Sequence, residues 1–366
     1  MSPGPGRGLL TPSAVRALAA DLGVRPSKRL SQNFVVDPGI VRRIVAAARL
    51  SPGERVVEVG PGLGSLTLGL LEAGASVACV EVDPLLAAAL PGTVAAFLGV
   101  PAPDAAPAPS PGAPISDMAG DGGRALAQVA GPDPRRFVVV EADALAVEAL
   151  PSGRASALVA NLPYSVATKV LLRFLERFDA IRHGLVMVQA EVAARLTAPP
   201  GSRTYGVPSA KLAWWAEARL AGRIPRNAFF PVPRVDSELV YFERREPPAA
   251  GVPRRRVFEV VDAAFAARRK TLRGALAGLA GGADRAEAAL AAAGIAATAR
   301  GETLGIDEFA RLAEALEAAG SAGAASGGTG PAEAGGAPMW AGHVAGGTTE
   351  QPAGPAQAAR GGAADG

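Results

Sequence analysis

Cysteine and histidine are scarce in this sequence, and their scarcity excludes several kinds of site. The 366 residues include one cysteine and two histidines. A single cysteine can form neither an intrachain disulfide nor a cysteine-rich metal site. Cys79 lies inside the apolar run SVACVEV, so we expect it to be buried as a small hydrophobic side chain. His183 and His343 occur in unrelated contexts, which argues against a histidine-based metal site.

Long apolar runs and a strong net charge are also missing. No run is long and apolar enough to span a bilayer, and the first residues, MSPGPGRGLL, lack the apolar core of a signal peptide. The 37 basic and 34 acidic residues leave a formal charge of +3, which is too small by itself to indicate a nucleic-acid partner. We therefore expect a cytoplasmic protein with no membrane contact.

Two long stretches lack hydrophobic periodicity. Residues 99–134 and 320–366 are rich in alanine, glycine and proline, and such segments bury too little apolar surface to offset the entropy lost on ordering. We therefore expect a disordered insert at 99–134, with at most one short helical turn at 124–129, and a disordered tail at 320–366. We also expect residues 1–10 to be flexible.

Short valine-rich runs alternate with helical stretches between residues 11 and 246. The runs are apolar throughout, which is typical of strands buried on both faces of a sheet. The predicted strands are residues 55–59, 76–82, 137–142, 157–161, 184–189, 219–224 and 238–243, and the first two predicted helices are residues 11–22 and 38–48. This alternation predicts an α/β fold with a doubly wound, Rossmann-like parallel sheet.

The pattern changes after Pro247 and Pro248. Four helical stretches follow, at residues 257–265, 271–279, 285–292 and 306–318. The sequence therefore predicts a main domain at 11–246, a boundary near 246–253, and a smaller helical domain at 253–319.

A glycine-rich turn, EVGPGLGSLT at residues 58–67, follows the first long predicted strand. Such a turn lets a ligand approach the backbone and the N-terminus of the next helix. Gly60 and Gly62 fit the dinucleotide pattern G-x-G-x-x-G, but Ser65 takes the place of its third glycine. The form E-x-G-x-G-x-G is instead typical of S-adenosylmethionine-dependent methyltransferases. Glu81 ends the next strand, where a carboxylate accepts ribose hydroxyls. The simpler alternative is a tight turn beside a solvated carboxylate.

Two further polar side chains follow predicted strands. Asp143 comes after the third strand and Asn161 after the fourth. The carboxyl ends of the strands in a doubly wound sheet face the ligand crevice, so Gly60, Glu81, Asp143 and Asn161 should converge on one rim. A carboxylate at Asp143 is placed to accept a hydrogen bond from an adenine amine, although aspartate is also a common helix N-cap.

The fourth strand ends in Asn161-Leu162-Pro163-Tyr164. The N6 nitrogen of adenine is a poor nucleophile because its lone pair is delocalised into the ring. The Asn161 side-chain oxygen and the Leu162 carbonyl can hold the two N6 hydrogens out of the ring plane, which localises the lone pair towards a sulfonium methyl group. Pro163 fixes the backbone, and Tyr164 offers a ring for stacking. The alternative is a helix start, with Asn161 as N-cap and proline in the first turn.

Seven segments together carry a family resemblance. They are SQNFVVD, EVGPGLGSLT, EVD, ADAL, ANLPYSVAT, AFFPVPRVDS (residues 228–237) and AFAARRKTLRGAL (residues 264–276). In this order, over residues 12–318 apart from the insert, they resemble the bacterial small-subunit ribosomal RNA adenine N6,N6-dimethyltransferases, the KsgA/RsmA family.

The resemblance implies a cofactor and a set of site residues. S-adenosyl-L-methionine is the implied cofactor, and Tyr164 and Phe229 are implied to sandwich the target adenine. The residues implied to line the cofactor site are Asn33, Val35, Gly60, Gly62, Glu81, Asp143 and Asn161.

Basic residues gather in the predicted helical domain. They are Arg254, Arg255, Arg256, Arg268, Arg269, Lys270 and Arg273. These residues form two clusters, at 254–256 and at 268–273. Two basic clusters on one small domain favour a phosphate-binding surface, which would suit RNA with a flipped or single-stranded target base. The alternative is a solvated charged face.

The function that best fits these features is transfer of methyl groups from S-adenosylmethionine to adenine N6 in small-subunit ribosomal RNA. We expect the partner to be this RNA within a pre-ribosomal particle, and we expect a monomer without a metal. The first alternative is a large-subunit rRNA adenine N6-methyltransferase of the macrolide-resistance type. A mainly non-catalytic ribosome-assembly factor is another, and a NAD-dependent oxidoreductase is the most distant one because the glycine pattern differs.

Overall fold

The structure is a computed structural model of the chain. Its described residues are 8–24, 33–101, 124–128, 136–150, 154–267 and 270–326, of which 124–128 and 321–326 are described by secondary structure alone. The described residues up to Gly323 belong to one compact unit.

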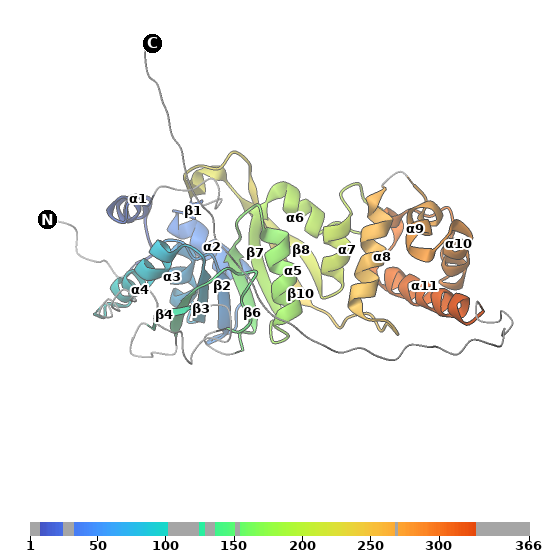
Figure 1. Ribbon diagram of the computed structural model, residues 1–366. Coiled ribbons are helices and arrows are strands. Elements are labelled where there is room, and N and C mark those ends of the chain that lie inside the picture. Colours follow the sequence, from blue (N-terminus) through green and yellow to red (C-terminus); the bar gives the residue numbers. More distant parts are fainter. Residues whose placement is uncertain are drawn as a thin grey trace, which may run out of the picture. The chain divides into compact units, whose positions relative to one another are not determined.

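Ten strands lie in the described residues. They are β1 (Phe34–Val35), β2 (Arg55–Val59), β3 (Ser76–Glu81), β4 (Arg124–Gln128), β5 (Phe137–Glu141), β6 (Ala157–Asn161), β7 (His183–Gln189), β8 (Ala216–Ile224), β9 (Phe229–Phe230) and β10 (Ser237–Arg244). Eight of them form one sheet in the order β4-β5-β3-β2-β6-β7-β10-β8, and β1 pairs with β9 in a separate ribbon (Figure 1).

The five central strands of the large sheet run parallel. They are β5, β3, β2, β6 and β7, and their bounds agree with the predicted strands to within one residue. The outer strands β4, β10 and β8 instead pair antiparallel with their neighbours. A parallel pair needs a long crossover, but the segment between β8 and β10 contains only the short helix η1 (Arg226–Ala228) and β9. The chain therefore turns back on itself there.

Helices cover both faces of the sheet (Figure 1). One face packs against α2 (Pro38–Ala47), α3 (Ser65–Glu72) and α4 (Pro84–Leu98), and the other packs against α5 (Ala167–Arg177), α6 (Ala190–Leu196) and α7 (Val207–Ala213). Alternating strand residues supply the two cores: Val56 belongs to the first and Val57 to the second. A further helix, α1 (Pro12–Asp21), has Thr11 as its N-cap, and the Thr11 side chain accepts a hydrogen bond from the Ala14 N–H.

Four helices follow the sheet. They are α8 (Arg254–Ala266), α9 (Leu272–Ala280), α10 (Ala283–Ala292) and α11 (Ile306–Ser326). Their apolar side chains continue the core of the second face, since the Phe258 ring makes T-shaped contacts with Trp214 and Trp215 at centroid distances of 6.0 and 5.4 Å. The stretch at 246–253 carries no strand or helix, and the division into two domains there stays a prediction.

Three local features differ from the sequence expectations. Arg124–Gln128 is a strand and not a helical turn, because it completes the hydrogen bonding of β5, which would otherwise be an edge strand. The helix α11 continues to Ser326, into the range 320–366, where alanine favours helix. Leu9 lies in the range 1–10 that was expected to be flexible, but its side chain is buried, with only 6% exposed. The rest of the expected insert and tail lies outside the described residues, apart from 99–101.

A glycine in β7 gives a test of the sheet packing. A Cβ atom at Gly184 would lie 2.2 Å from the Leu158 carbonyl oxygen and 2.6 Å from the Phe242 ring. We expect Gly184→Ala to lower the unfolding free energy by roughly 1–3 kcal/mol, as overpacking does. The control is Gly92→Ala in α4, where nothing lies within 4 Å and a gain of about 0.5–1 kcal/mol is expected. Urea unfolding measures both, and equal stability of the two variants would contradict this packing.

Candidate active site

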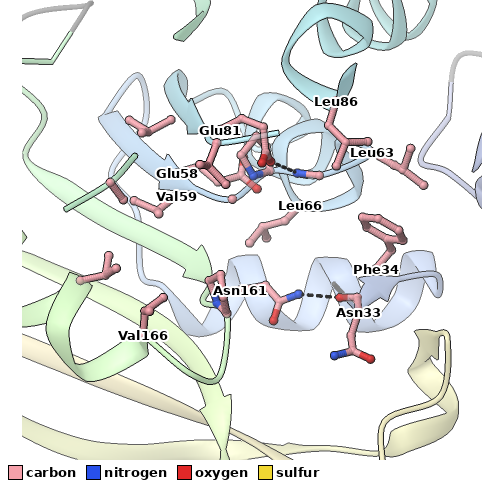
Figure 2. Close-up of a pocket in the computed structure, with 18 of the residues that line it drawn as sticks. Asn33, Phe34, Glu58, Val59, Leu63, Leu66, Glu81, Leu86, Asn161 and Val166 are labelled. Atoms are coloured by element: carbon pink, nitrogen blue, oxygen red, sulfur yellow. Dashed lines mark hydrogen bonds between the residues drawn. The ribbon is translucent and has the colours of Figure 1, made fainter. Parts of the chain in front are cut away.

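A cavity of about 260 Å³ lies at the carboxyl ends of the parallel strands. Residues that follow β2, β3, β5 and β6 line the cavity. In the sheet, β3 lies on one side of β2 and β6 lies on its other side. This reversal of strand order is where ligands bind in doubly wound sheets. The predicted site residues that line the cavity are Asn33, Val35, Gly60, Gly62, Glu81, Asp143, Asn161 and Pro163. Figure 2 shows how several of them surround it.

The glycine turn forms one wall of the cavity and requires glycine for two reasons. Gly62 has φ +58°, a left-handed conformation that other residues rarely adopt. A Cβ atom there would also lie 2.8 Å from the ring of Phe34. Gly64, at φ +93°, leads directly into α3. The turn therefore brings bare backbone to the cavity, which suits close approach of a ligand.

Glu81 fastens the glycine turn to β3. Its carboxylate accepts hydrogen bonds from the backbone N–H groups of Gly62 and Asp83, each at 3.0 Å, and the first of these is drawn in Figure 2. The side chain is buried, and burial raises its pKa. Each carboxylate oxygen has a second acceptor position, so Glu81 can hold the turn and still accept a ligand hydroxyl.

Glu58 also lines the cavity, near the end of β2, and is 1% exposed. It accepts a hydrogen bond from the Thr67 hydroxyl at 2.7 Å and a weaker one from the Cys79 thiol at 3.7 Å. Burial raises the pKa of Glu58 to about 8, and the nearby Glu81 carboxylate adds to the shift. Glu58 is therefore mainly protonated at pH 7. Burial also raises the pKa of Cys79, so this thiol is an inert core side chain, as expected.

Asn161 ends β6 with its amide held in one orientation. The Nδ2 group donates to the backbone carbonyl of Asn33 at 2.9 Å (Figure 2). The Oδ1 atom of the same amide therefore remains an acceptor. The alternative of a helix cap is wrong, because α5 begins at Ala167 and its N-cap is Val166. Asp143, by contrast, accepts a local hydrogen bond from Leu145 N–H at 2.8 Å while it lines the cavity.

Three predicted catalytic residues lie outside the cavity lining. Leu162 is buried, and its N–H donates to the Met187 carbonyl at 3.1 Å. Tyr164 is half-buried, and its hydroxyl shares a 2.7 Å hydrogen bond with Ser237. Phe229 belongs to β9, pairs with Val35 and is 2% exposed. The stacking role of Tyr164 and Phe229 stays a prediction.

The chain also matches a known protein family. The family described as ribosomal RNA adenine dimethylase matches residues 24–97 and 127–318. The chain belongs to this family. As a family member it is an S-adenosylmethionine-dependent methyltransferase, as the sequence predicts.

Curated relatives match most of the chain. The ribosomal RNA small subunit methyltransferase A of Thermobifida fusca (strain YX) is 55% identical over 306 residues, which are 84% of this chain and 96% of the relative. Its counterpart from Cutibacterium acnes (strain DSM 16379 / KPA171202) is 50% identical over 319 residues, 86% of this chain and 96% of the relative.

Solved structures share the fold of the chain. A dimethyladenosine transferase from Plasmodium falciparum superposes with a TM-score of 0.59 at 18% identity, covering 78% of this chain and 98% of that one. The 23S rRNA methyltransferase ErmE superposes with a TM-score of 0.52 at 26% identity, covering 78% and 99%.

The residues that line the cavity fit an adenosyl cofactor. The buried Glu81 carboxylate suits a hydroxyl, and the bare backbone at Gly62 suits a closely approaching ligand. Sequence reasoning missed several lining residues, of which most are apolar: Phe34, Leu63, Ser65, Leu66, Val82, Leu86, Val166 and Val170. Most of them lie close to the motif residues in the sequence, and this proximity was the only sequence feature that indicated them.

The arginines of the basic clusters are ion-paired where the structure describes them. Arg254 pairs with Glu176. Arg255 and Arg256 both pair with Glu259 at about 3 Å. Arg273 pairs with Asp284 and Glu287 at 2.9 and 2.7 Å. These pairs favour the alternative of a charged protein face at these positions, whereas Arg268 and Arg269 lie outside the described residues. A phosphate-binding surface stays a prediction.

Two further features are absent from the described part of the chain. None of its helices combines the length and the hydropathy needed to cross a bilayer. No group of three or more histidine, cysteine, aspartate or glutamate side chains there could hold a metal ion.

The glycine turn gives a paired test of cofactor binding. Gly62→Ala places a side chain at φ +58° against Phe34, whereas Gly53→Ala meets the same strain at φ +74° with nothing within 4 Å. Each substitution should cost about 1–2 kcal/mol of unfolding free energy from the left-handed backbone. Only Gly62→Ala should weaken S-adenosylhomocysteine binding in calorimetry, by about tenfold or more. Wild-type affinity in Gly62→Ala would contradict the site.

Glu58 gives a pH test. In the folded protein its carboxyl keeps its proton up to about pH 8, whereas its ordinary pKa is 4.5. The folded state holds more protons than the unfolded chain between these values, so Glu58 lowers the unfolding free energy as the pH rises through this window, by at most about 1.4 kcal/mol per pH unit.

The substitution Glu58→Gln removes this titration, and the amide oxygen can still accept the hydrogen bond from Thr67. The unfolding free energy of the variant minus that of the wild type should therefore increase from pH 5 to pH 8. Urea unfolding at several pH values measures the difference. A difference that is constant across this range would show that Glu58 is ionised in the folded protein.

Proposed function

We propose that this chain transfers two methyl groups from S-adenosylmethionine to N6 of adenines in small-subunit ribosomal RNA, giving N6,N6-dimethyladenosine. Its RNA substrate would be part of a pre-ribosomal particle in the cytoplasm, and the enzyme would act as a monomer without a metal. The relatives named small subunit methyltransferase A support this substrate, since they are 50–55% identical over most of both chains. The 23S rRNA methyltransferase ErmE is only 26% identical, which disfavours the large-subunit alternative.

The observation that carries this proposal is the orientation of the Asn161 amide. Its Nδ2 group is already bound to the Asn33 carbonyl, so its Oδ1 atom can accept a hydrogen from the adenine N6 amine. The Leu162 carbonyl follows directly and is proposed to accept the second N6 hydrogen. Two acceptors of this kind draw the nitrogen lone pair out of conjugation with the ring, which makes N6 nucleophilic.

The rest of the site positions the reactants. S-adenosylmethionine supplies a methyl group that is activated by its sulfonium, so a strong general base is not needed. Glu81 and Asp143 are proposed to accept hydrogen bonds from the ribose and adenine of this cofactor. Glu58 is mainly protonated at pH 7 and adds little negative charge beside them.

The target base is proposed to stack against Tyr164. The hydroxyl of Tyr164 shares a hydrogen bond with Ser237, so the Asn-Leu-Pro-Tyr segment is tied to the end of the segment AFFPVPRVDS. Phe229, at the start of that segment, is 2% exposed. Its proposed contact with the adenine therefore requires the short β1–β9 pair to shift when RNA binds.

One transfer assay separates the candidate functions. Labelled S-adenosylmethionine is incubated with the enzyme and either small or large ribosomal subunits that lack the modification. We expect label in small-subunit RNA as N6,N6-dimethyladenosine. Label in large-subunit RNA alone would favour the macrolide-resistance type. Binding to small subunits without any transfer would favour a non-catalytic assembly factor.

Substitutions at Asn161 and Tyr164 test the roles of the two side chains. Asn161→Ala should keep the fold and reduce methyl transfer by roughly 100- to 1000-fold, as the loss of a positioned electrostatic partner does. Tyr164→Ala should impair transfer, whereas Tyr164→Phe should be mild because stacking needs the ring. Mass spectrometry of nucleosides measures monomethyl and dimethyl products. Wild-type rates in Asn161→Ala, with loss of activity in Tyr164→Phe, would assign the chemistry to the tyrosine hydroxyl instead.

A further inference from the structure

Helix α2 lies beside the edge strand β8. In the described sheet β8 is the last strand, with β10 as its neighbour. At one end, the Val36 N–H before α2 donates to the Ala228 carbonyl after β8 at 2.8 Å. Further along, the Arg43 guanidinium of α2 donates to the Arg223 carbonyl of β8. The helix therefore runs along the edge of the sheet.

The surface along these two elements is basic. We call it the α2–β8 seam, made of residues 38–53 and 218–235, and neither segment contains an aspartate or a glutamate. Acidic side chains from outside the seam pair with some of its arginines, and a net positive charge remains. The arginines of the seam are Arg42, Arg43, Arg49, Arg219, Arg223, Arg226 and Arg234. The ion pairs are Arg42 with Glu72, Arg223 with Glu238, and Arg226 with Asp236.

Two arginines of the seam share one aromatic ring. The guanidinium carbons of Arg49 and Arg219 lie 5.3 and 4.3 Å from the centre of the Tyr241 ring, which attracts them through cation–π contacts. Both side chains are exposed, and among the described residues neither forms an ion pair with an acidic side chain. The nearby Glu243 carboxylate instead accepts the Tyr241 hydroxyl at 2.9 Å. Two guanidinium groups held beside one ring repel each other, so an anion from outside the chain suits this position.

The seam leads away from the proposed base site. Ser237, which shares a hydrogen bond with Tyr164, begins β10, and Tyr241 lies four residues further along this strand. At about 3.4 Å per residue this places them roughly 14 Å apart. An RNA strand carries a phosphate at every nucleotide, so a strand whose adenine stacks on Tyr164 can bring another phosphate to Arg49 and Arg219. The planar guanidinium group fits phosphate oxygens well.

We propose that the α2–β8 seam binds the phosphate backbone of the substrate RNA beside the target adenine, and that Arg49 and Arg219 together hold one phosphate group. Neither residue lines the cavity, so this contact positions the RNA strand and takes no part in the chemistry. The seam differs from the phosphate surface expected at 254–256 and 268–273, where the described arginines are already ion-paired. The inference rests on the proposed function, because it takes RNA as the substrate.

Removal of the two charges tests the inference. Arg49→Gln/Arg219→Gln should weaken binding to small ribosomal subunits that lack the modification by about tenfold or more, as the loss of hydrogen bonds to a charged group does. The slope of log Kd against log salt should fall by roughly 1–2, because fewer counterions are released from the RNA. In the transfer assay, KM for the subunits should rise while kcat stays close to that of the wild type, since only binding is lost.

Two matched variants separate the local charge from the net charge and from folding. Arg154→Gln/Arg195→Gln removes two exposed arginines that are ion-paired elsewhere on the surface, and it should leave the salt slope unchanged. Arg49→Lys/Arg219→Lys keeps both charges and should retain most of the slope, although lysine lacks the planar fork of arginine. The affinity for S-adenosylhomocysteine should be the same in all variants, because none of these residues lines the cavity.

Several results would overturn the inference. They are an unchanged salt slope in Arg49→Gln/Arg219→Gln, an equal fall in Arg154→Gln/Arg195→Gln, and an equal fall in the lysine variant. A protein-free RNA fragment with the target adenine provides a further check. If the glutamine variant at Arg49 and Arg219 binds this fragment like the wild type and only intact subunits more weakly, the seam contacts an acidic ribosomal protein instead. Failure of the wild type to methylate small-subunit RNA would contradict the proposed function itself.

Discussion

The hydrogen bond between the Glu81 carboxylate and the backbone of Gly62 holds the site together. It joins the end of β3 to the glycine turn that follows β2, and the Gly60 N–H adds a second link to the Val80 carbonyl at 2.9 Å. With the turn closed in this way, α3 begins at the cavity wall. The wall therefore brings the Glu81 carboxylate and the bare backbone at Gly62 together, and both suit an adenosyl cofactor.

A second link fixes the side of the cavity where we propose that the base reacts. Asn161 and Asn33 are far apart in the sequence, yet their hydrogen bond joins the end of β6 to the segment before β1. The bond uses a donor of the Asn161 amide and leaves its oxygen as an acceptor, which we propose binds the adenine amine. Tyr164 is joined to Ser237 in the same manner, so both motifs of the proposed base site are positioned by contacts between distant segments.

Local patterns in the sequence predicted the parts of this site that depend on neighbouring residues. Valine-rich runs located the central strands, and parallel strands bring their carboxyl ends to one edge, so the convergence of Gly60, Glu81, Asp143 and Asn161 could be foreseen. The hydrogen bond between Asn161 and Asn33, the protonation of Glu58 and the burial of Phe229 could not, because each depends on which distant groups surround the side chain. The ion pairs of Arg273 with Asp284 and Glu287 could not be predicted either, because they depend on how α9 packs against α10.

The central claim is that the Asn161 amide, oriented by Asn33, makes adenine N6 nucleophilic. A crystal structure of the enzyme with S-adenosylhomocysteine and an RNA fragment containing the target adenine tests it most directly. The account predicts N6 at about 3 Å from both Asn161 Oδ1 and the Leu162 carbonyl oxygen, with Asn161 Nδ2 still bound to the Asn33 carbonyl. An N6 held by other groups, or an Asn161 amide turned so that Nδ2 faces the base, would contradict it.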